Sequence, residues 1–384
     1  MLAPVGNSIS LNSADAALPV FDGYEAVLVN SGTAALTLAL RVAKQQAEEQ
    51  RTEVIIPAYA CPDLITASAG AGVTPVLCDI GAGDPGYELE HLKSLLSERT
   101  LAVIAVNFLG IRDRLDEIDA LANHCGAVLI EDDAQWYPED ESLLRGAMVI
   151  TSFGRGKPAS IHGGGALLVR DEIAQACNNI LSGYRDAVGV RGLQRWQYLA
   201  KVVAYNICLN PSVYGLVARL PGLAIGATVY KPPQPVTAMP ATMRALLAGN
   251  IERYLLSRRA VEQAWREQLD DQGEERVNLP VRLSARAGRM LRYPLLLKDK
   301  AARDEMLEAL NRQGLGGSAM YQRPLTGIQG VPLEIIGAGS GGAPVDYRNA
   351  AVFADRMLTL PVHEFVMQSE VMKIRAILEI TTKY

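Results

Sequence analysis

The stretch Ala127-Val-Leu-Ile-Glu-Asp-Asp-Ala-Gln135 begins with four apolar residues and continues into three consecutive acidic ones. Its apolar part has the composition of a buried strand. In a parallel sheet, carboxylates that directly follow such a strand lie at the edge where these sheets bind ligands. The stretch therefore predicts a ligand site at a sheet edge, although a solvated acidic turn that caps the next helix is the alternative interpretation.

Similar apolar runs lie on both sides of this stretch and alternate with segments of helical spacing. The runs expected to form buried strands are 54–57, 75–79, 101–106, 148–151 and 166–169. Helical spacing covers 33–50, 63–72 and 115–125. This alternation predicts an α/β fold with a mostly parallel sheet flanked by helices.

The helical period returns after a break and introduces a second, smaller unit. Residues 241–267 are expected to form one long helix, followed by strands at 291–297 and 358–361 and a helix at 301–313. We therefore predict a large domain over 1–245, and a linker helix with a small C-terminal α+β domain over 246–384.

Composition narrows the class of protein. The 384 residues include 37 basic and 42 acidic ones, and a net charge of −5 argues against a general nucleic-acid binder. The five cysteines form no CxxC pair, which argues against a disulfide framework or a structural zinc site and favours a reducing, cytoplasmic location. The N-terminus shows no signal-peptide pattern.

Residues 182–240 form an atypical apolar insertion, and the stretch 196–230 could suggest a membrane span. Lys201, Asn206 and Pro211 interrupt it, so no long uncharged helix remains. We expect a pair of buried or interface helices and no stable membrane insertion. A surface that touches lipid or an apolar substrate is the alternative.

The segment Asn30-Ser-Gly-Thr-Ala-Ala35 immediately precedes a helical pattern. Free N–H groups at a helix start, a glycine that allows close approach and nearby hydroxyl groups together suit a phosphate dianion. An ordinary N-cap supplied by Ser31 or Thr33 would explain the same residues.

The segment Thr151-Ser-Phe-Gly-Arg-Gly-Lys157 also follows a predicted strand. A lysine held inside a site loses solvation, which lowers its pKa and makes its amine nucleophilic enough to form a Schiff base. Ser152 on the same loop could contribute a hydroxyl to a phosphate site. Considered alone, Lys157 would be an ordinary surface residue.

Taken in order, these segments resemble the DegT/DnrJ/StrS family of fold-type I, pyridoxal-phosphate-dependent sugar aminotransferases. The matching motifs are Ser31-Gly-Thr-Ala-Ala-Leu36, Glu131-Asp-Asp-Ala-Gln135, Ser152-Phe-Gly-Arg-Gly-Lys157 and Gly164-Gly-Ala166. The resemblance covers residues 25–180 well and 240–380 loosely. Four ordered motifs form a joint signal that none of them carries alone.

The resemblance implies a role for each matching residue. Lys157 would hold pyridoxal phosphate as a Schiff base and later move the proton between substrate and cofactor. Asp132 would pair with the protonated ring nitrogen and keep the ring an electron sink. Gln135 would lie near the phenolic oxygen of the ring. The residues implied to hold the phosphate group are Gly32, Thr33, Ala34 and Ser152.

Departures from the family pattern leave several points open. The aromatic residue that usually covers the ring has no clear match, so either Tyr59 or Cys61 would take that place. The family's Gly-x-Asn-x-Arg-Met segment, which acts across the dimer interface, also has no clear match. Some relatives carry histidine in place of the lysine and dehydrate their substrate, and Lys157 argues against that branch.

The resulting expectation is a homodimeric aminotransferase of polysaccharide biosynthesis. It would move an amino group from a donor, which the resemblance implies is glutamate, to a keto group on a nucleotide-linked sugar. One alternative is a pyridoxal-phosphate-binding regulator without turnover, and another is a transaminase for a non-sugar or lipid-linked ketone. A nicotinamide dehydrogenase that uses the glycines of 337–342 is a third, although we interpret those glycines as a loop.

Overall fold

The computed structural model describes residues 1–12, 18–189, 192–217, 228–337 and 346–381. Within these ranges seven strands form one main sheet in the order β1-β7-β6-β5-β4-β2-β3. They are β1 (Tyr24–Val29), β2 (Glu53–Pro57), β3 (Thr74–Cys78), β4 (Thr100–Val106), β5 (Val128–Asp133), β6 (Met148–Ser152) and β7 (Gly165–Arg170). All neighbouring pairs are parallel except those of β7, which runs antiparallel to β1 and β6. The predicted α/β fold is confirmed.

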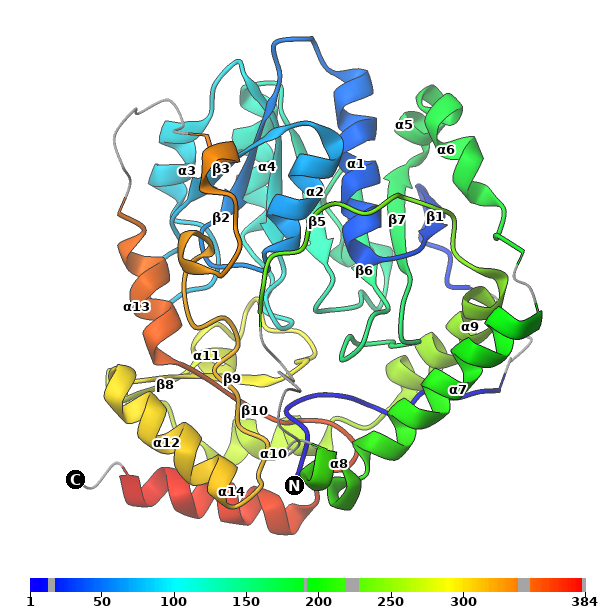
Figure 1. Cartoon of the computed structure of the whole chain (residues 1–384). Coiled ribbons are helices and arrows are strands. Elements are labelled where there is room, and N and C mark those ends of the chain that lie inside the picture. The colour runs from blue at the N-terminus through cyan, green and yellow to red at the C-terminus, as the bar shows by residue number, and fades with distance from the viewer. Residues whose placement is uncertain (13–17, 190–191, 218–227, 338–345, 382–384) are drawn as a thin grey trace.

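Helices cover both faces of this sheet (Figure 1). They are α1 (Gly32–Gln46), α2 (Asp63–Ala71), α3 (Leu89–Leu95), α4 (Leu115–His124), α5 (Asp171–Ala176) and α6 (Asn178–Arg185). Leu36, Leu38 and Leu40 of α1 are buried in the core, and each contributes about 1.5–3 kcal/mol through burial. On the opposite face, Ile118 of α4 packs in a second cluster with Leu129 of β5. The sheet is therefore buried on both sides, which explains its continuous apolar strands.

The C-terminal part has its own antiparallel sheet of β8 (Arg276–Asn278), β9 (Tyr293–Leu297) and β10 (Met357–Leu360), in the order β10-β9-β8. Its helices are α11 (Leu279–Arg282), α12 (Lys300–Arg312), α13 (Arg348–Arg356) and α14 (Gln368–Thr381), with 3-10 turns η2 (Leu325–Gly327) and η3 (Leu333–Ile335). A further turn, η1 (Glu141–Leu143), precedes β6. These elements agree with the α+β character predicted for this region.

The prediction of a single helix over 241–267 is wrong, because the chain forms two helices there, α9 (Ala241–Leu256) and α10 (Ala260–Gln268). Ser257 ends α9 with an extended backbone. The Arg289 guanidinium donates hydrogen bonds to the carbonyls of Tyr254 and Ser257. These carbonyls lie at the end of α9, so a distant side chain stabilises the break.

The apolar insertion forms α7 (Gly192–Leu209) and α8 (Pro211–Val217), beside α9 at the lower part of the molecule (Figure 1). No helix in the described ranges is both long and apolar enough to span a bilayer. The glycine-rich segment lies outside the described residues except for Gly337, which pairs with Val76.

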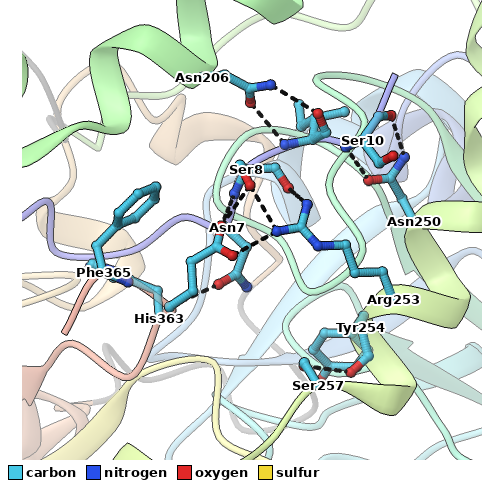
Figure 2. Close-up of polar contacts among 12 residues, drawn as sticks. Asn7, Ser8, Ser10, Asn206, Asn250, Arg253, Tyr254, Ser257, His363 and Phe365 are labelled. Atoms are coloured by element: carbon cyan, nitrogen blue, oxygen red, sulfur yellow. Dashed lines mark hydrogen bonds and ion pairs between the residues drawn. The ribbon is translucent and has the colours of Figure 1, made fainter. Parts of the chain in front are cut away.

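The first twelve residues, here called the N-terminal strap, lie between α7, α9 and the C-terminal part (Figure 2). Asn206 of α7 accepts a hydrogen bond from the Ile9 N–H and donates one to the Ile9 carbonyl, both at 2.8 Å. Asn250 of α9 makes the same pair of contacts with Ser10 at 2.9 and 3.0 Å. The strap thus links three elements that are far apart in the sequence.

Candidate active site

The start of α1 lies directly against the end of β6. A Cβ atom on Gly32 would be only 2.6 Å from the Ser152 Cβ, so the close approach requires glycine at this position. Ser31 caps α1 by accepting a hydrogen bond from the Ala34 N–H at 3.0 Å. The Thr33 hydroxyl donates to Asp63 at 3.1 Å. The predicted phosphate residues are therefore neighbours. To bind an anion, the Thr33 hydroxyl would have to release Asp63, and the Ala34 N–H would have to release Ser31.

Asp132 lies in the last part of β5, on the face of the sheet that α1 covers, because Ile130 of the same face packs with the α1 core. Its carboxylate accepts a hydrogen bond from the Ala134 N–H at 2.9 Å. Burial raises the pKa of Asp132, while the Ala134 N–H and the Lys157 ammonium oppose that rise. A buried carboxylate in this position would gain from a cationic partner.

Lys157 lies on the loop between β6 and β7 and is partly buried. Phe153 holds the base of this loop, because its N–H donates to the Gly164 carbonyl and its carbonyl accepts from the Ile161 N–H, both at 2.9 Å. No ion pair within the described ranges involves Lys157. Its ammonium still acts on Asp132 and on the Cys61 thiol through space. Adjacent strands therefore bring the two predicted catalytic residues to one edge.

Tyr59 and Cys61 occupy different surroundings although they are only two residues apart. Tyr59 is buried in an aromatic cluster, with ring centroids 4.9 Å from Phe353 and 5.5 Å from Phe108. Cys61 is partly buried, and burial raises the pKa of its thiol to about 12, with Asp63 adding to the rise and Lys157 opposing it. Of the two candidates, Cys61 has the lysine and Asp132 as electrostatic neighbours.

Gln135 connects this edge to the C-terminal part of the chain. Its carbonyl oxygen accepts from the Leu109 N–H at 3.0 Å, and its amide donates to the Tyr321 hydroxyl at 2.8 Å. Both ends of the side chain are thus fixed. Tyr321 also lies beside Tyr59, with ring centroids 5.6 Å apart.

Sequence reasoning missed two residues of this site. Asp63 begins α2, receives the Thr33 hydroxyl and influences the pKa of both Cys61 and Asp132. An acidic residue in a first helical turn could have drawn attention to it. Tyr321 follows a turn in the C-terminal part, and no local pattern marks it.

Helix α7 covers the outer side of the lysine loop. The Tyr198 hydroxyl donates to the Ile161 carbonyl at 2.6 Å, and the Tyr205 ring packs edge-on against His162 at 5.4 Å. Val5 of the strap lies close to Gly156 of this loop. A Cβ atom on Gly156 would be 2.9 Å from the Val5 side chain. His162 therefore packs against α7.

Comparison with known proteins decides the family. A model of the DegT/DnrJ/EryC1/StrS aminotransferase family matches residues 20–212 and 237–379. The chain belongs to this family. The match omits residues 213–236, within the insertion between α7 and α9. The family resemblance expected from the four sequence motifs is confirmed, and pyridoxal phosphate is the cofactor that goes with it.

Individual relatives of the DegT/DnrJ/EryC1/StrS type share part of the chain. The L-glutamine:2-deoxy-scyllo-inosose aminotransferase of Streptomyces paromomycinus is 29% identical over 179 residues, which are 45% of this chain and 42% of that protein. The UDP-2-acetamido-2-deoxy-3-oxo-D-glucuronate aminotransferase of Pseudomonas aeruginosa is 32% identical over 134 residues, covering 33% and 37% respectively. The chain thus spans less than half the length of these curated relatives.

A solved structure extends the likeness in fold to the whole chain. Helicobacter pylori PseC, an aminotransferase involved in the biosynthesis of pseudoaminic acid, superimposes with a TM-score of 0.71 at 16% identity. The superposition covers 100% of this chain and 99% of that one. At this identity the comparison supports the fold.

The residues at the sheet edge fit pyridoxal phosphate chemically. Gly32 leaves room for a close approach at the start of α1, where N–H groups and the Ser152 hydroxyl favour an anion. Asp132 is a buried carboxylate that would be stabilised by a protonated ring nitrogen. Lys157 supplies the primary amine that an aldehyde requires.

Proposed function

We propose that this protein is a pyridoxal-phosphate-dependent aminotransferase. The observation that carries the proposal is that Lys157 and Asp132 lie at one edge of the sheet, where the ammonium opposes the rise in the pKa of the Asp132 carboxyl. Neighbouring parallel strands, β5 and β6, bring them there. When bound, the cofactor supplies an electron sink for the carbon that loses its proton.

Each residue of the site would have a separate role. Lys157 would bind the aldehyde and, once released, carry the proton between two carbon atoms. Asp132 would hold the ring nitrogen in its protonated form, and Gln135, fixed at both ends, would orient the ring oxygen. Gly32, Thr33, Ala34 and Ser152 would hold the phosphate group, and Cys61 would lie against the ring.

Glutamate as the donor and a nucleotide-linked keto-sugar as the acceptor are the finer part of the proposal. The support is the Pseudomonas aeruginosa relative, whose name states a UDP-linked oxo-sugar. A homodimer acting in the cytoplasm is likewise proposed on the family resemblance. A lipid-linked ketone is the second candidate acceptor, favoured by the exposed apolar side of α7, where Leu193 and Trp196 face solvent.

Borohydride reduction followed by peptide mapping tests the site. The reduced adduct is expected on Lys157, and Lys157→Ala should abolish it together with essentially all activity. Lys93→Ala, which removes an exposed lysine of α3, is the matched control and should keep both. An adduct on another lysine would overturn the assignment.

Spectroscopy separates an enzyme from a regulator. Glutamate should shift the visible absorbance of the loaded protein, and a keto-sugar nucleotide should restore it. If no amine shifts the absorbance while the adduct at Lys157 is retained, the protein binds the cofactor without turnover.

A further inference from the structure

Charge is distributed unevenly along this chain. Residues 187–251, here called the basic segment, contain no Asp or Glu and six Lys or Arg, for a charge of +6. The remaining 31 basic and 42 acidic residues give −11. The six cations are Arg191, Arg195, Lys201, Arg219, Lys231 and Arg244. An acidic protein therefore carries one continuous basic segment, which includes α7 and α8.

Helix α7 is apolar on two opposite sides. Val202 and Leu209 are buried on its inner side. Leu193, Trp196, Val203 and Ile207, here called the outer stripe, share the other side at i, i+3, i+10 and i+14. Their exposed fractions are 70%, 71%, 42% and 55%. A helix with apolar residues on both sides normally has both of them covered.

The outer stripe is displayed by a helix that is fixed in place. On the inner side of α7, the Asn206 amide is paired with Ile9 of the strap, and the Tyr198 hydroxyl is bonded to the lysine loop (Figure 2 shows the Asn206 contact). Val203 and Ile207 of the stripe, together with Val213 of α8, line an open groove of about 470 Å³ between the two helices. The exposed stripe therefore cannot turn inward without breaking these contacts.

Cations accompany the stripe on the same helix. Arg195 and Lys201 are exposed, and no ion pair within the described ranges involves either of them. Arg244 of α9 is also exposed. Helices α7 and α8 contain no Asp or Glu that could pair with these cations in a second copy, which disfavours a second copy as the occupant.

An anionic lipid surface matches all of these features. Its headgroups attract Lys and Arg at about 1 kcal/mol each near the surface, and its acyl boundary accepts apolar side chains. Tryptophan prefers the depth between these two regions. We propose that the outer stripe of α7, together with Arg195 and Lys201 of the same helix, docks on the surface of an anionic phospholipid bilayer.

Vesicle sedimentation with the full-length, cofactor-loaded protein tests the proposal. Binding is expected to mixed phosphatidylcholine–phosphatidylglycerol vesicles, to be much weaker to phosphatidylcholine alone, and to fall as salt is added. Trp196→Gln combined with Ile207→Gln should weaken binding by about tenfold or more. The control pair Val352→Gln and Met372→Gln changes other exposed apolar residues, on α13 and α14, and should bind as the wild type does.

A second pair of variants tests the charges separately. Arg195→Gln with Lys201→Gln should lower the affinity for the mixed vesicles about 30-fold. Lys93→Gln with Lys373→Gln makes the same change in net charge on α3 and α14 and should have little effect. Unchanged melting temperatures show that each variant is folded.

The proposal is wrong if the wild-type protein does not bind the anionic vesicles. It is equally wrong if the control substitutions reduce binding as much as the substitutions on α7 do. It is also wrong if Trp196→Gln with Ile207→Gln converts a dimer to a monomer in sedimentation while vesicles do not bind, because a second copy then covers the stripe. None of these measurements depends on aminotransferase activity, so they succeed or fail independently of the proposed function.

Discussion

The carboxyl edge of the main sheet and helix α7 both carry residues on which the proposals depend, but the surroundings of these residues differ. At the edge, Asp132, Gln135 and Lys157 are held by buried strands and by neighbouring backbone groups. On α7, the inner residues are held in the same way, whereas Leu193 and Trp196 of the outer stripe face solvent. A buried sheet fixes chemical groups in position, and a surface helix displays a face that still needs an occupant.

Both regions lie within the part of the chain that matches the family. The model of the DegT/DnrJ/EryC1/StrS family matches every strand of the edge and all of α7, and it omits residues 213–236, which begin within α8. We infer that the chemistry resides at the edge, while the partner surface resides on α7. Substitutions in the first should change turnover, and substitutions in the second should change stability or docking.

After the loss of activity expected for Lys157→Ala, the largest effect is expected for Asp132→Asn. The neutral amide no longer stabilises a positive charge opposite it, and loss of one such electrostatic group commonly lowers kcat by about 10²–10³-fold. Steady-state transamination rates test this. Asp133→Asn is the matched control, because Asp133 projects to the other face of the same strand. Equal loss in both variants would contradict the role given to Asp132.

A smaller effect, on stability, is expected in the strap. Asn250→Ala removes both partners of the Ser10 backbone at a buried position, and we expect it to lower the free energy of unfolding by about 2–3 kcal/mol. Asn206→Ala removes the equivalent contacts to Ile9 at a partly buried position and should cost about 1 kcal/mol. Urea denaturation measures both. The borohydride adduct at Lys157 should form in each variant, and its loss would show that the strap also shapes the site.

A third effect depends on pH and concerns Asp133, on the opposite face of β5 from Asp132. Burial and the Glu131 carboxylate raise the pKa of Asp133 well above its ordinary value of 3.8. The folded protein then keeps a proton that the unfolded chain has lost. Stability therefore falls as pH rises above about 4, by up to about 1.4 kcal/mol per pH unit until the raised pKa is passed.

Asp133→Asn removes this titration and retains an oxygen that can accept from Asn107. Its stability relative to the wild type should therefore increase between about pH 5 and pH 8. Urea denaturation at several pH values measures the difference. Asp346→Asn, at an exposed aspartate, should give a constant difference. Parallel curves for Asp133→Asn and the wild type would mean that Asp133 is ionised in the folded state.

The sequence by itself determined strands β2–β7 of the main sheet, its mostly parallel character and the order of the motifs, because buried strands require continuous apolar runs and helices require their own period. It also placed Asp132 and Lys157 at the ends of two consecutive predicted strands. The family match and the sheet order confirm that fold. The roles of the individual site residues stay predictions that the experiments above would test.

Only the tertiary structure decided which distant residues meet. Tyr321 reaches Gln135, Arg289 stabilises the end of α9, and the strap joins α7 to α9, and no local pattern marks any of these contacts. The same holds for α7, whose apolar residues read alike in sequence although one side is buried and the other is exposed. Local periodicity reports which face of an element is apolar, whereas long-range packing determines what lies against that face.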